Sequence, residues 1–136
     1  MTNMIVGILA ATGAWFVAAA VLFFNPPVDR LYNSQASHPA VRSLPKAPKT
    51  IGLILAAVFA QCVLWAWVFT LIKPVLPADA PMRGVMFGVV LTVTKIVPRD
   101  IDRLLLTTYP TQRMAIEAVI GVICAFVVGF AFAYTL

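Results

Sequence analysis

Four long apolar runs, separated by polar and proline-containing segments, dominate the pattern of this chain. The first run, positions 4–24, contains no charged residue, and at 1.5 Å per residue it reaches about 31 Å, close to the roughly 30 Å of a hydrocarbon core. The other runs cover positions 50–73, 82–97 and 111–135. Because a lipid-exposed segment satisfies its own backbone groups as a helix, each run predicts one transmembrane helix. The predicted fold class is therefore all-α: a polytopic membrane protein whose single domain, 1–136, is an up-and-down bundle of four helices.

The third run differs from the others, because 16 residues span only about 24 Å. Pro98 follows it, and a proline removes a backbone amide and clashes with the preceding turn. The pattern leaves open whether Pro98 ends this helix or kinks it. Beyond the proline, charged residues and leucines share the segment 99–106, which predicts a short amphipathic helix lying in the membrane interface between helices three and four. In such a helix the i,i+3 ion pairs would be Arg99–Asp102 and Asp100–Arg103.

The polar segment 25–49 contains five prolines, so it predicts a stiff surface loop. A short interfacial helix is predicted within it, with Leu31 and Tyr32 facing lipid. The tryptophans fall into two groups. Trp15 lies near the middle of helix one and is expected to pack inside the bundle, whereas Trp65 and Trp67 are expected in an interfacial aromatic belt at the far end of helix two.

Composition supports a membrane location. The 136 residues are 62% hydrophobic and 11% charged, whereas a soluble domain is about half apolar and about a quarter charged. In a soluble protein the net charge of +5 would suggest nucleic acid as a partner. This sequence, however, has no basic helix and no basic patch interleaved with aromatic residues. The lipid bilayer, including its anionic lipids, is the partner that this charge predicts instead.

The distribution of positive charge predicts the orientation. Eight Lys and Arg residues lie in or beside the first and third loops, and two lie beside the second loop: Arg30, Arg42, Lys46, Lys49, Lys95, Arg99, Arg103 and Arg113 against Lys73 and Arg83. Short loops rich in Lys and Arg stay in the cytoplasm. The first and third loops are therefore predicted to be cytoplasmic and both termini extracytoplasmic.

Small residues recur at four-residue spacing on the predicted helices. Gly84 and Gly88 form such a pair on helix three, and a four-step ladder runs along helix four through Gly121, Ala125, Gly129 and Ala133. Membrane helices associate by close backbone packing, which small residues permit. These positions predict a close helix contact, either within the chain or between copies.

Few polar residues lie deep in the apolar runs, and three of them are candidates for a site: Gln61, Lys95 and Glu117. An ionisable residue in a membrane helix is a candidate for function. Lys95 is two residues from the end of its run, so its amine is expected to snorkel to the interface. Glu117 lies about 9 Å into helix four. The prediction is an ion pair of Glu117 with Lys95, Arg99 or Arg103 that fastens helices three and four. The group formed by Lys95, Arg99, Asp100, Asp102 and Arg103 is also a candidate for binding an anionic head group.

No catalytic constellation, metal site or cofactor site is predicted. Cys62 and Cys124 do not form a paired-cysteine motif, and the single histidine, His38, lies in a loop. A structural zinc site needs about four ligands. A small multidrug-type antiporter would require a carboxylate deep in helix one, which contains none.

The stretch RGVMFGVVLTVTKIVPRDIDRLLLTTYP, positions 83–110, followed by AIEAVIGVICAFVVGFAFAYTL, positions 115–136, resembles the second half of small uncharacterised bacterial four-helix membrane proteins, a domain-of-unknown-function family. The shared features are a Gly-xxx-Gly third helix, a proline-terminated polar segment, a Tyr-Pro turn and a last helix with spaced glycines. These relatives often carry a Trp-Tyr pair near the end of helix one, where this chain has Trp15-Phe16. The resemblance implies a bacterial inner-membrane location and no established activity, and it assigns no functional residue.

Two functions fit these observations. The first is a structural or accessory subunit that packs through its small-residue faces into a homo-oligomer or a larger membrane complex. The alternative is a carrier, channel or binding bundle for a small or lipid-like molecule, with a polar site near the cytoplasmic interface. A transporter needs polar groups on both sides of the midplane, and helices one and four have few beyond their cytoplasmic third. The pattern therefore favours the accessory role.

Overall fold

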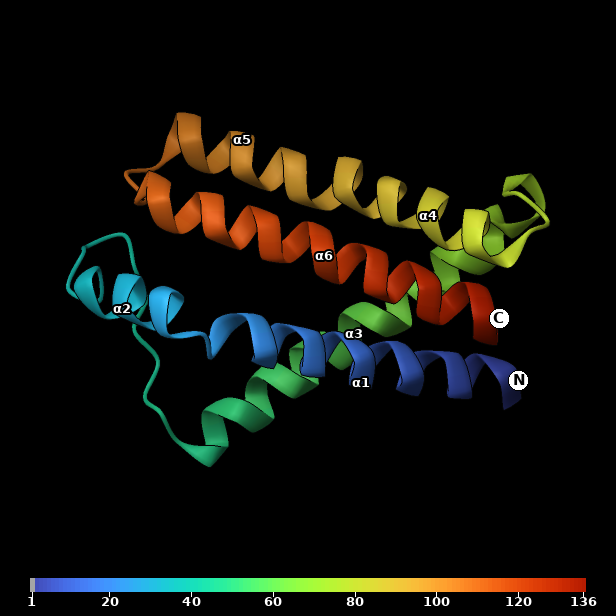
Figure 1. Ribbon diagram of the computed structural model, residues 1–136, viewed down its shortest axis with the longest axis horizontal. Helices are drawn as coiled ribbons and strands as arrows, with labels where there is room; N and C mark the ends of the chain where they lie inside the picture. Colours follow the sequence, from blue (N-terminus) through green and yellow to red (C-terminus); the bar gives the residue numbers. More distant parts are fainter. Residues whose placement is uncertain (1) are drawn as a thin grey trace.

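The computed structural model describes residues 2–136, and this part of the chain is almost entirely helical (Figure 1). Within it, four helical stretches are long and apolar enough to cross a membrane: Thr2–Phe23, Pro48–Val75, Ala80–Leu106 and Thr111–Thr135. The first is α1, the second is α3 (Pro48–Ile72) with the short turn η1 (Lys73–Val75), and the last is α6. The chain is thus an all-α, multi-pass membrane protein, which confirms the fold class predicted from the four apolar runs.

The spans alternate in direction, so the bundle has two distinct ends (Figure 1). The terminal end holds the beginning of α1, the end of α6 and the connection between the second and third spans. The loop end holds the short helix α2 (Pro26–Ser34), the loop 35–47 and the turn 107–110. Pro26 and Pro27 occupy the first positions of α2, where a missing amide is tolerated, so the prolines that end α1 also begin the next helix.

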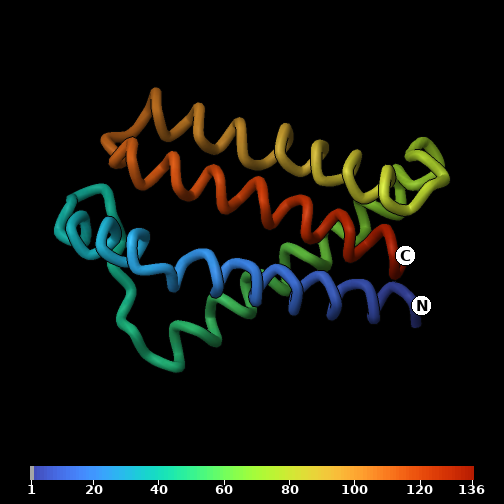
Figure 2. Tube along the Cα trace, in the orientation of Figure 1, coloured from blue at the N-terminus to red at the C-terminus, as the bar shows by residue number. Residues whose placement is uncertain are grey.

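The third span continues through Pro98 instead of ending there. It consists of α4 (Ala80–Leu91), the π-helical turn η2 (Thr92–Ile96) and α5 (Val97–Leu106), and the tube in Figure 2 follows one continuous helix. In the widened turn the amide of Val97 donates to the carbonyl of Thr92, five residues earlier. A π-turn of this kind accommodates the proline ring and its missing amide without ending the helix. The prediction of a separate interfacial helix over 99–106 is therefore corrected: this segment is helical, but it extends helix three.

The predicted small-residue faces form the contact between α4 and α6 within the chain. A Cβ atom added to Gly129 would lie 2.9 Å from the backbone nitrogen of Gly88, and one added to Gly84 would lie 3.1 Å from the Cα of Phe130. Both distances are shorter than real Cβ atoms allow, or close to that limit, so the two backbones touch only because glycine is present. Ala125 and Ala133 are buried on α6, and Gly121 faces Ile96 of η2.

An aromatic cluster closes the bundle toward the terminal end. Phe69 of α3, Phe87 of α4 and Phe132 of α6 are fully buried, with ring centroids 4.9 to 6.0 Å apart. From this cluster toward the loop end, α3 crosses the other helices steeply, so that the beginning of α3 lies away from the bundle (Figure 1). Residues 51–57 are consequently exposed. The interior therefore has an aromatic seal at one end and opens toward the other.

Adding one methyl group at Gly129 is predicted to weaken the α4–α6 contact. In the Gly129→Ala variant the methyl group would meet backbone atoms that cannot rotate away, so the helices must separate, at a cost of about 1–3 kcal/mol. The measurement is the unfolding free energy in a detergent titration. Gly52→Ala is the matched control, because nothing lies within 4 Å of that position. Equal stability of the two variants would contradict the close backbone contact.

Candidate functional site

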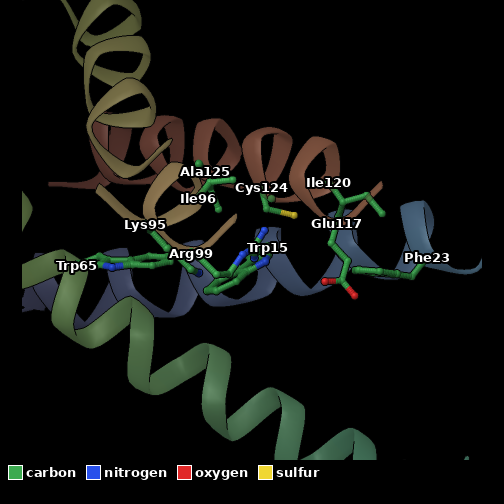
Figure 3. Close-up of a pocket in the computed structure, with 11 residues that line it drawn as sticks. Trp15, Phe23, Trp65, Lys95, Ile96, Arg99, Glu117, Ile120, Cys124 and Ala125 are labelled. Carbon is green, nitrogen blue, oxygen red and sulfur yellow. The ribbon is translucent and has the colours of Figure 1, made fainter. Parts of the chain in front are cut away.

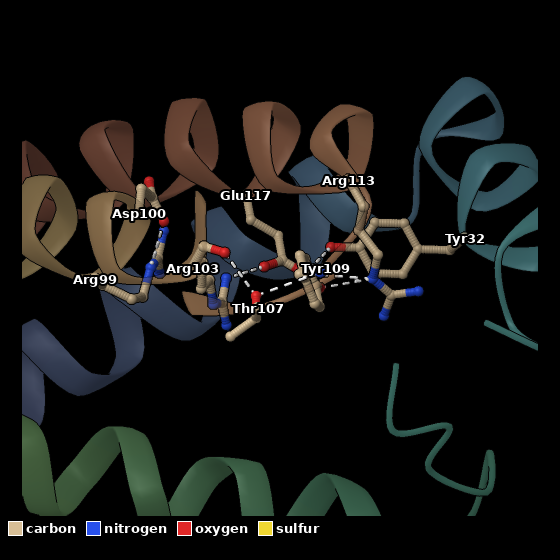
Figure 4. A network of polar contacts seen from close by, with 8 residues as sticks. All are labelled: Tyr32, Arg99, Asp100, Arg103, Thr107, Tyr109, Arg113 and Glu117. Carbon is tan, nitrogen blue, oxygen red and sulfur yellow. Dashed lines mark hydrogen bonds and ion pairs between the residues drawn. The ribbon is translucent and has the colours of Figure 1, made fainter. Parts of the chain in front are cut away.

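Four polar side chains converge on the Glu117 carboxylate at the loop end (Figure 4). Arg103 of α5 donates to one carboxylate oxygen at 2.6 Å. The other oxygen accepts from Tyr32 of α2 at 2.8 Å, from Tyr109 of the turn at 2.5 Å and from Arg113, one turn earlier on α6, at 3.4 Å. This group, the Glu117 cluster, is therefore made of Glu117, Arg103, Arg113, Tyr32 and Tyr109, and it joins α2, α5, the turn and α6.

The phenols of the Glu117 cluster act as neutral hydrogen-bond donors. Burial raises the pKa of Tyr32, and the charge of Glu117 raises it further. Burial likewise raises the pKa of Tyr109, together with its hydrogen bond to Glu117. Because both phenols keep their protons, Glu117 supplies the negative charge of the cluster. It balances one of the two guanidinium groups, so the cluster carries one net positive charge. Two cation–π contacts tie it further: the Arg113 guanidinium lies 3.7 Å from the Tyr32 ring centroid, and that of Arg103 lies 4.6 Å from the Tyr109 ring.

A second polar group surrounds Lys95 in the middle of the bundle. The Lys95 amine donates to the Gln61 amide oxygen at 2.7 Å. It also lies 4.4 Å from the Trp15 ring centroid and 4.2 Å from that of Trp65, and the two indoles stack with centroids 5.2 Å apart. We call these four residues the Lys95 box. A desolvated cation–π contact contributes about 2 kcal/mol, so the box offsets much of the roughly 2.5–3.5 kcal/mol cost of a charge inside a membrane.

The continuous third span changes the predicted position of Lys95. Helix three extends 11 residues beyond it to Leu106, about 16 Å of helix, so Lys95 is not at the end of its span. Its amine reaches Trp15 and Gln61, both near the middle of their helices, instead of snorkelling to the interface. The predicted Lys95–Glu117 pair is not formed, and Arg103 is the partner that Glu117 takes from α5.

A cavity of about 170 Å³ connects the two groups (Figure 3). The indole of Trp65 lies at one end of this inner cavity and the Glu117 carboxylate and Phe23 lie at the other, with Lys95, Arg99 and Trp15 between them. Its remaining lining comes from η2 and α6: Ile96, Ile120, Gly121, Cys124 and Ala125.

Lys95 is the charged group of the inner cavity that lacks an opposite charge. Arg99 is paired with its neighbour Asp100 at 2.8 Å, and Glu117 is paired with Arg103 and Arg113. Among residues 2–136, no carboxylate lies within ion-pairing distance of Lys95. An anionic group placed in the inner cavity would complete this charge balance.

Several predicted details are corrected. Arg99 pairs with Asp100, not with Asp102, because α5 leaves Asp102 exposed, and Asp100 does not pair with Arg103. Tyr32 contacts Glu117 and the edge of Phe23 instead of facing lipid. Trp65 lies inside the bundle with Trp15, and of the two tryptophans assigned to the aromatic belt only Trp67 is exposed.

The sequence did not identify the phenols and Arg113 as members of a site. Tyr32 lies on α2, 85 residues before Glu117, and Tyr109 lies in the turn before α6, eight residues before Glu117. No spacing within one helix therefore relates either phenol to the carboxylate. Arg113 stands four residues before Glu117 on the same helix, and this i,i+4 spacing was the one signal that could have revealed the pair.

The fold and these two groups define the class of the chain: a multi-pass helical membrane protein with an internal polar site. Comparison with protein-family models, curated protein sequences and solved structures finds no match. The resemblance of the second half to a bacterial family of unknown function stays a prediction.

Replacing Glu117 by Gln is predicted to destabilise the loop end. The amide cannot neutralise Arg103 and Arg113, whose side chains are only 31% and 13% exposed, so the variant leaves two partly buried charges unpaired. The expected loss is about 2 kcal/mol, measured as unfolding free energy in detergent. Asp102→Asn is the control, since the same chemical change occurs there at an exposed position. If both variants unfold alike, Glu117 does not hold the loop end together.

Proposed function

We propose that the protein is a membrane-embedded binding protein or carrier for a small anion, which is held in the inner cavity with Lys95 as its counter-charge. The observation that carries this proposal is the Lys95 amine: it lies at mid-bundle, lines a cavity and faces no carboxylate. An intramembrane ionisable residue is costly, and such residues mark ligand or ion pathways.

The size and chemistry of the inner cavity indicate the kind of ligand. A cavity of roughly 150 Å³ holds a molecule of the size of benzene, so 170 Å³ suits a compact molecule of that order. Lys95 and Arg99 supply positive charge, and the indoles of Trp15 and Trp65 supply flat apolar surface. These features favour a small carboxylate or phosphate with an apolar part.

The polar groups lie on one side of the aromatic seal. From Lys95 the polar lining leads through Arg99 to the Glu117 cluster at the loop end, whereas Phe69, Phe87 and Phe132 fill the bundle toward the terminal end. A ligand would therefore enter and leave from the loop end. A carrier would need a second conformation in which this seal opens.

An accessory role is the second proposal, and a different observation favours it. The glycine faces on α4 and α6 are already used within the chain, so they do not supply an interface between copies. The departure of α3 leaves an apolar groove of about 410 Å³ between α1 and α3, lined by apolar residues from Phe16 to Phe24 and from Ile51 to Val58. A transmembrane helix of a second copy or of another subunit could pack there.

We further propose that the protein lies in a bacterial cytoplasmic membrane with its loop end in the cytoplasm. Seven Lys and Arg residues lie at the loop end against two at the terminal end: Arg30, Arg42, Lys46, Lys49, Arg99, Arg103 and Arg113 against Lys73 and Arg83. The positive-inside rule then places both ends of the chain outside.

Cysteine labelling tests this orientation. Ala78→Cys at the terminal end is expected to react with a membrane-impermeant maleimide on intact cells, whereas Ser37→Cys at the loop end reacts only after permeabilisation. Both positions are exposed, and the native Cys62 and Cys124 are buried, so the background is low. The reverse pattern of labelling would overturn the orientation.

Native mass spectrometry of the protein, extracted from its own membrane in mild detergent, tests the binding function. Wild-type protein is expected to carry a defined small anionic mass, and Lys95→Met is expected to lose it. Lys46→Met is the matched control, because that lysine is exposed at the loop end and is expected to leave the bound mass unchanged. A thermal unfolding scan verifies that Lys95→Met is folded.

Two results would contradict the binding proposal. One is wild-type protein without any bound small molecule, and the other is equal retention by folded Lys95→Met. A stoichiometric complex with other membrane proteins, or a fixed homo-oligomer free of small molecules, would instead support the accessory role.

A further inference from the structure

A second cavity lies at the loop end, and two residues of the Glu117 cluster, Arg103 and Tyr109, line it. This outer basin measures about 560 Å³, and it is lined by Ala40, Arg42, Arg103, Thr107 and Tyr109. Arg42 belongs to the loop 35–47, and the other polar residues belong to the end of α5 and to the turn that follows. Arg103 and Tyr109 also hold Glu117, so residues of the Glu117 cluster line both the outer basin and the inner cavity.

The outer basin presents guanidinium groups without an acidic residue among its lining. Arg103 uses its Nη1 atom for Glu117, and its Nε and Nη2 atoms form no hydrogen bond with the rest of the described chain. Arg42 forms no side-chain hydrogen bond or ion pair with any residue of 2–136. Arginine presents a planar fork of donors that matches phosphate oxygens, so two arginines from different elements form a site suited to a phosphate group.

The surroundings of the outer basin place it at the boundary between lipid tails and head groups. Leu104, Leu105 and Leu106, which follow Arg103 on α5, are 59%, 74% and 79% exposed. Three consecutive exposed leucines are stable against acyl chains and costly in water. The neighbouring guanidinium groups then lie at the level of the head groups. This arrangement favours a phosphate that is attached to lipid over a free anion in solution.

We infer that the outer basin binds the phosphate head group of an anionic phospholipid, with Arg42 and Arg103 on the phosphate and the acyl chains along the leucines of α5. The inference does not rest on the inner cavity, because Arg42 does not line that cavity. It assigns a role to Arg42, whose charge would otherwise serve only the orientation of the chain.

The experiment measures binding of phosphatidylglycerol and phosphatidylcholine to the full chain in mild detergent by native mass spectrometry. Wild-type protein is expected to retain phosphatidylglycerol in preference to phosphatidylcholine. Arg42→Gln is expected to weaken retention of phosphatidylglycerol by at least about fivefold, the effect of one arginine near an anionic surface. Arg42 is exposed and makes no side-chain contact that the fold requires, so this variant should fold normally.

Arg30→Gln is the matched control, because Arg30 is an exposed arginine of the same end that does not line the outer basin. It is expected to retain the lipid as wild type does. An equal loss in both arginine variants would show general attraction to negative charge and would overturn the inference. No preference of the wild-type protein for the anionic lipid would overturn it as well.

A competition experiment distinguishes a lipid site from a site for free phosphate. Inorganic phosphate and glycerol phosphate, added at millimolar concentration, are expected to leave the bound phospholipid in place, since they lack the acyl chains. Displacement by either would identify a site for a soluble phosphate and contradict the lipid assignment. Lys95→Met is expected to bind phosphatidylglycerol normally, so failure of this inference and failure of the proposed function can be distinguished.

Discussion

The backbone of α4 meets the backbone of α6 at Gly84, Gly88 and Gly129, and this contact sets the positions of both polar groups. Because glycine has no side chain at these positions, the two helices run close together from the terminal end to the π-turn. That approach brings Lys95 and Arg103, which follow on the third span, beside the part of α6 that carries Glu117. The glycines thus define the site without belonging to it.

The π-turn is the second constraint, because it decides how far the third span reaches. Had Pro98 ended the helix, Arg103 would not have approached Glu117 from α5, and Lys95 would have lain at the interface. The turn Thr92–Ile96 keeps the helix continuous, and the hydroxyls of Thr92 and Thr94 donate to carbonyls four residues earlier. This one turn of altered hydrogen bonding therefore keeps Lys95 in the middle of the bundle.

The fold class follows from the sequence because the physics of a bilayer allows few alternatives. Apolar length predicts the spans, and the four-residue spacing of small residues predicts a close contact, which the structure assigns to α4 and α6. Predicted partners inside the bundle were less accurate. Trp65 and Tyr32 both appeared suited to the membrane interface. The Trp65 ring instead contacts Lys95 inside the bundle, and the Tyr32 ring contacts Arg113 at the loop end. Such contacts depend on where a loop folds back and how steeply α3 crosses, and neither is encoded by periodicity.

The charged residues differ in whether they have ion-pair partners, and this difference favours a binding role at the inner cavity. Glu117 and Asp100 are both paired with arginines, so the charges of the Glu117 cluster and of the Arg99–Asp100 pair balance apart from one positive charge on the cluster. Lys95 lies deeper in the bundle, and its amine contacts the Gln61 amide and the indoles of Trp15 and Trp65. A purely structural bundle would gain stability from an apolar residue at that position, because packing would replace a desolvated charge. The amine is held in place beside an unfilled cavity, which is the arrangement expected of a group whose partner arrives from outside the chain.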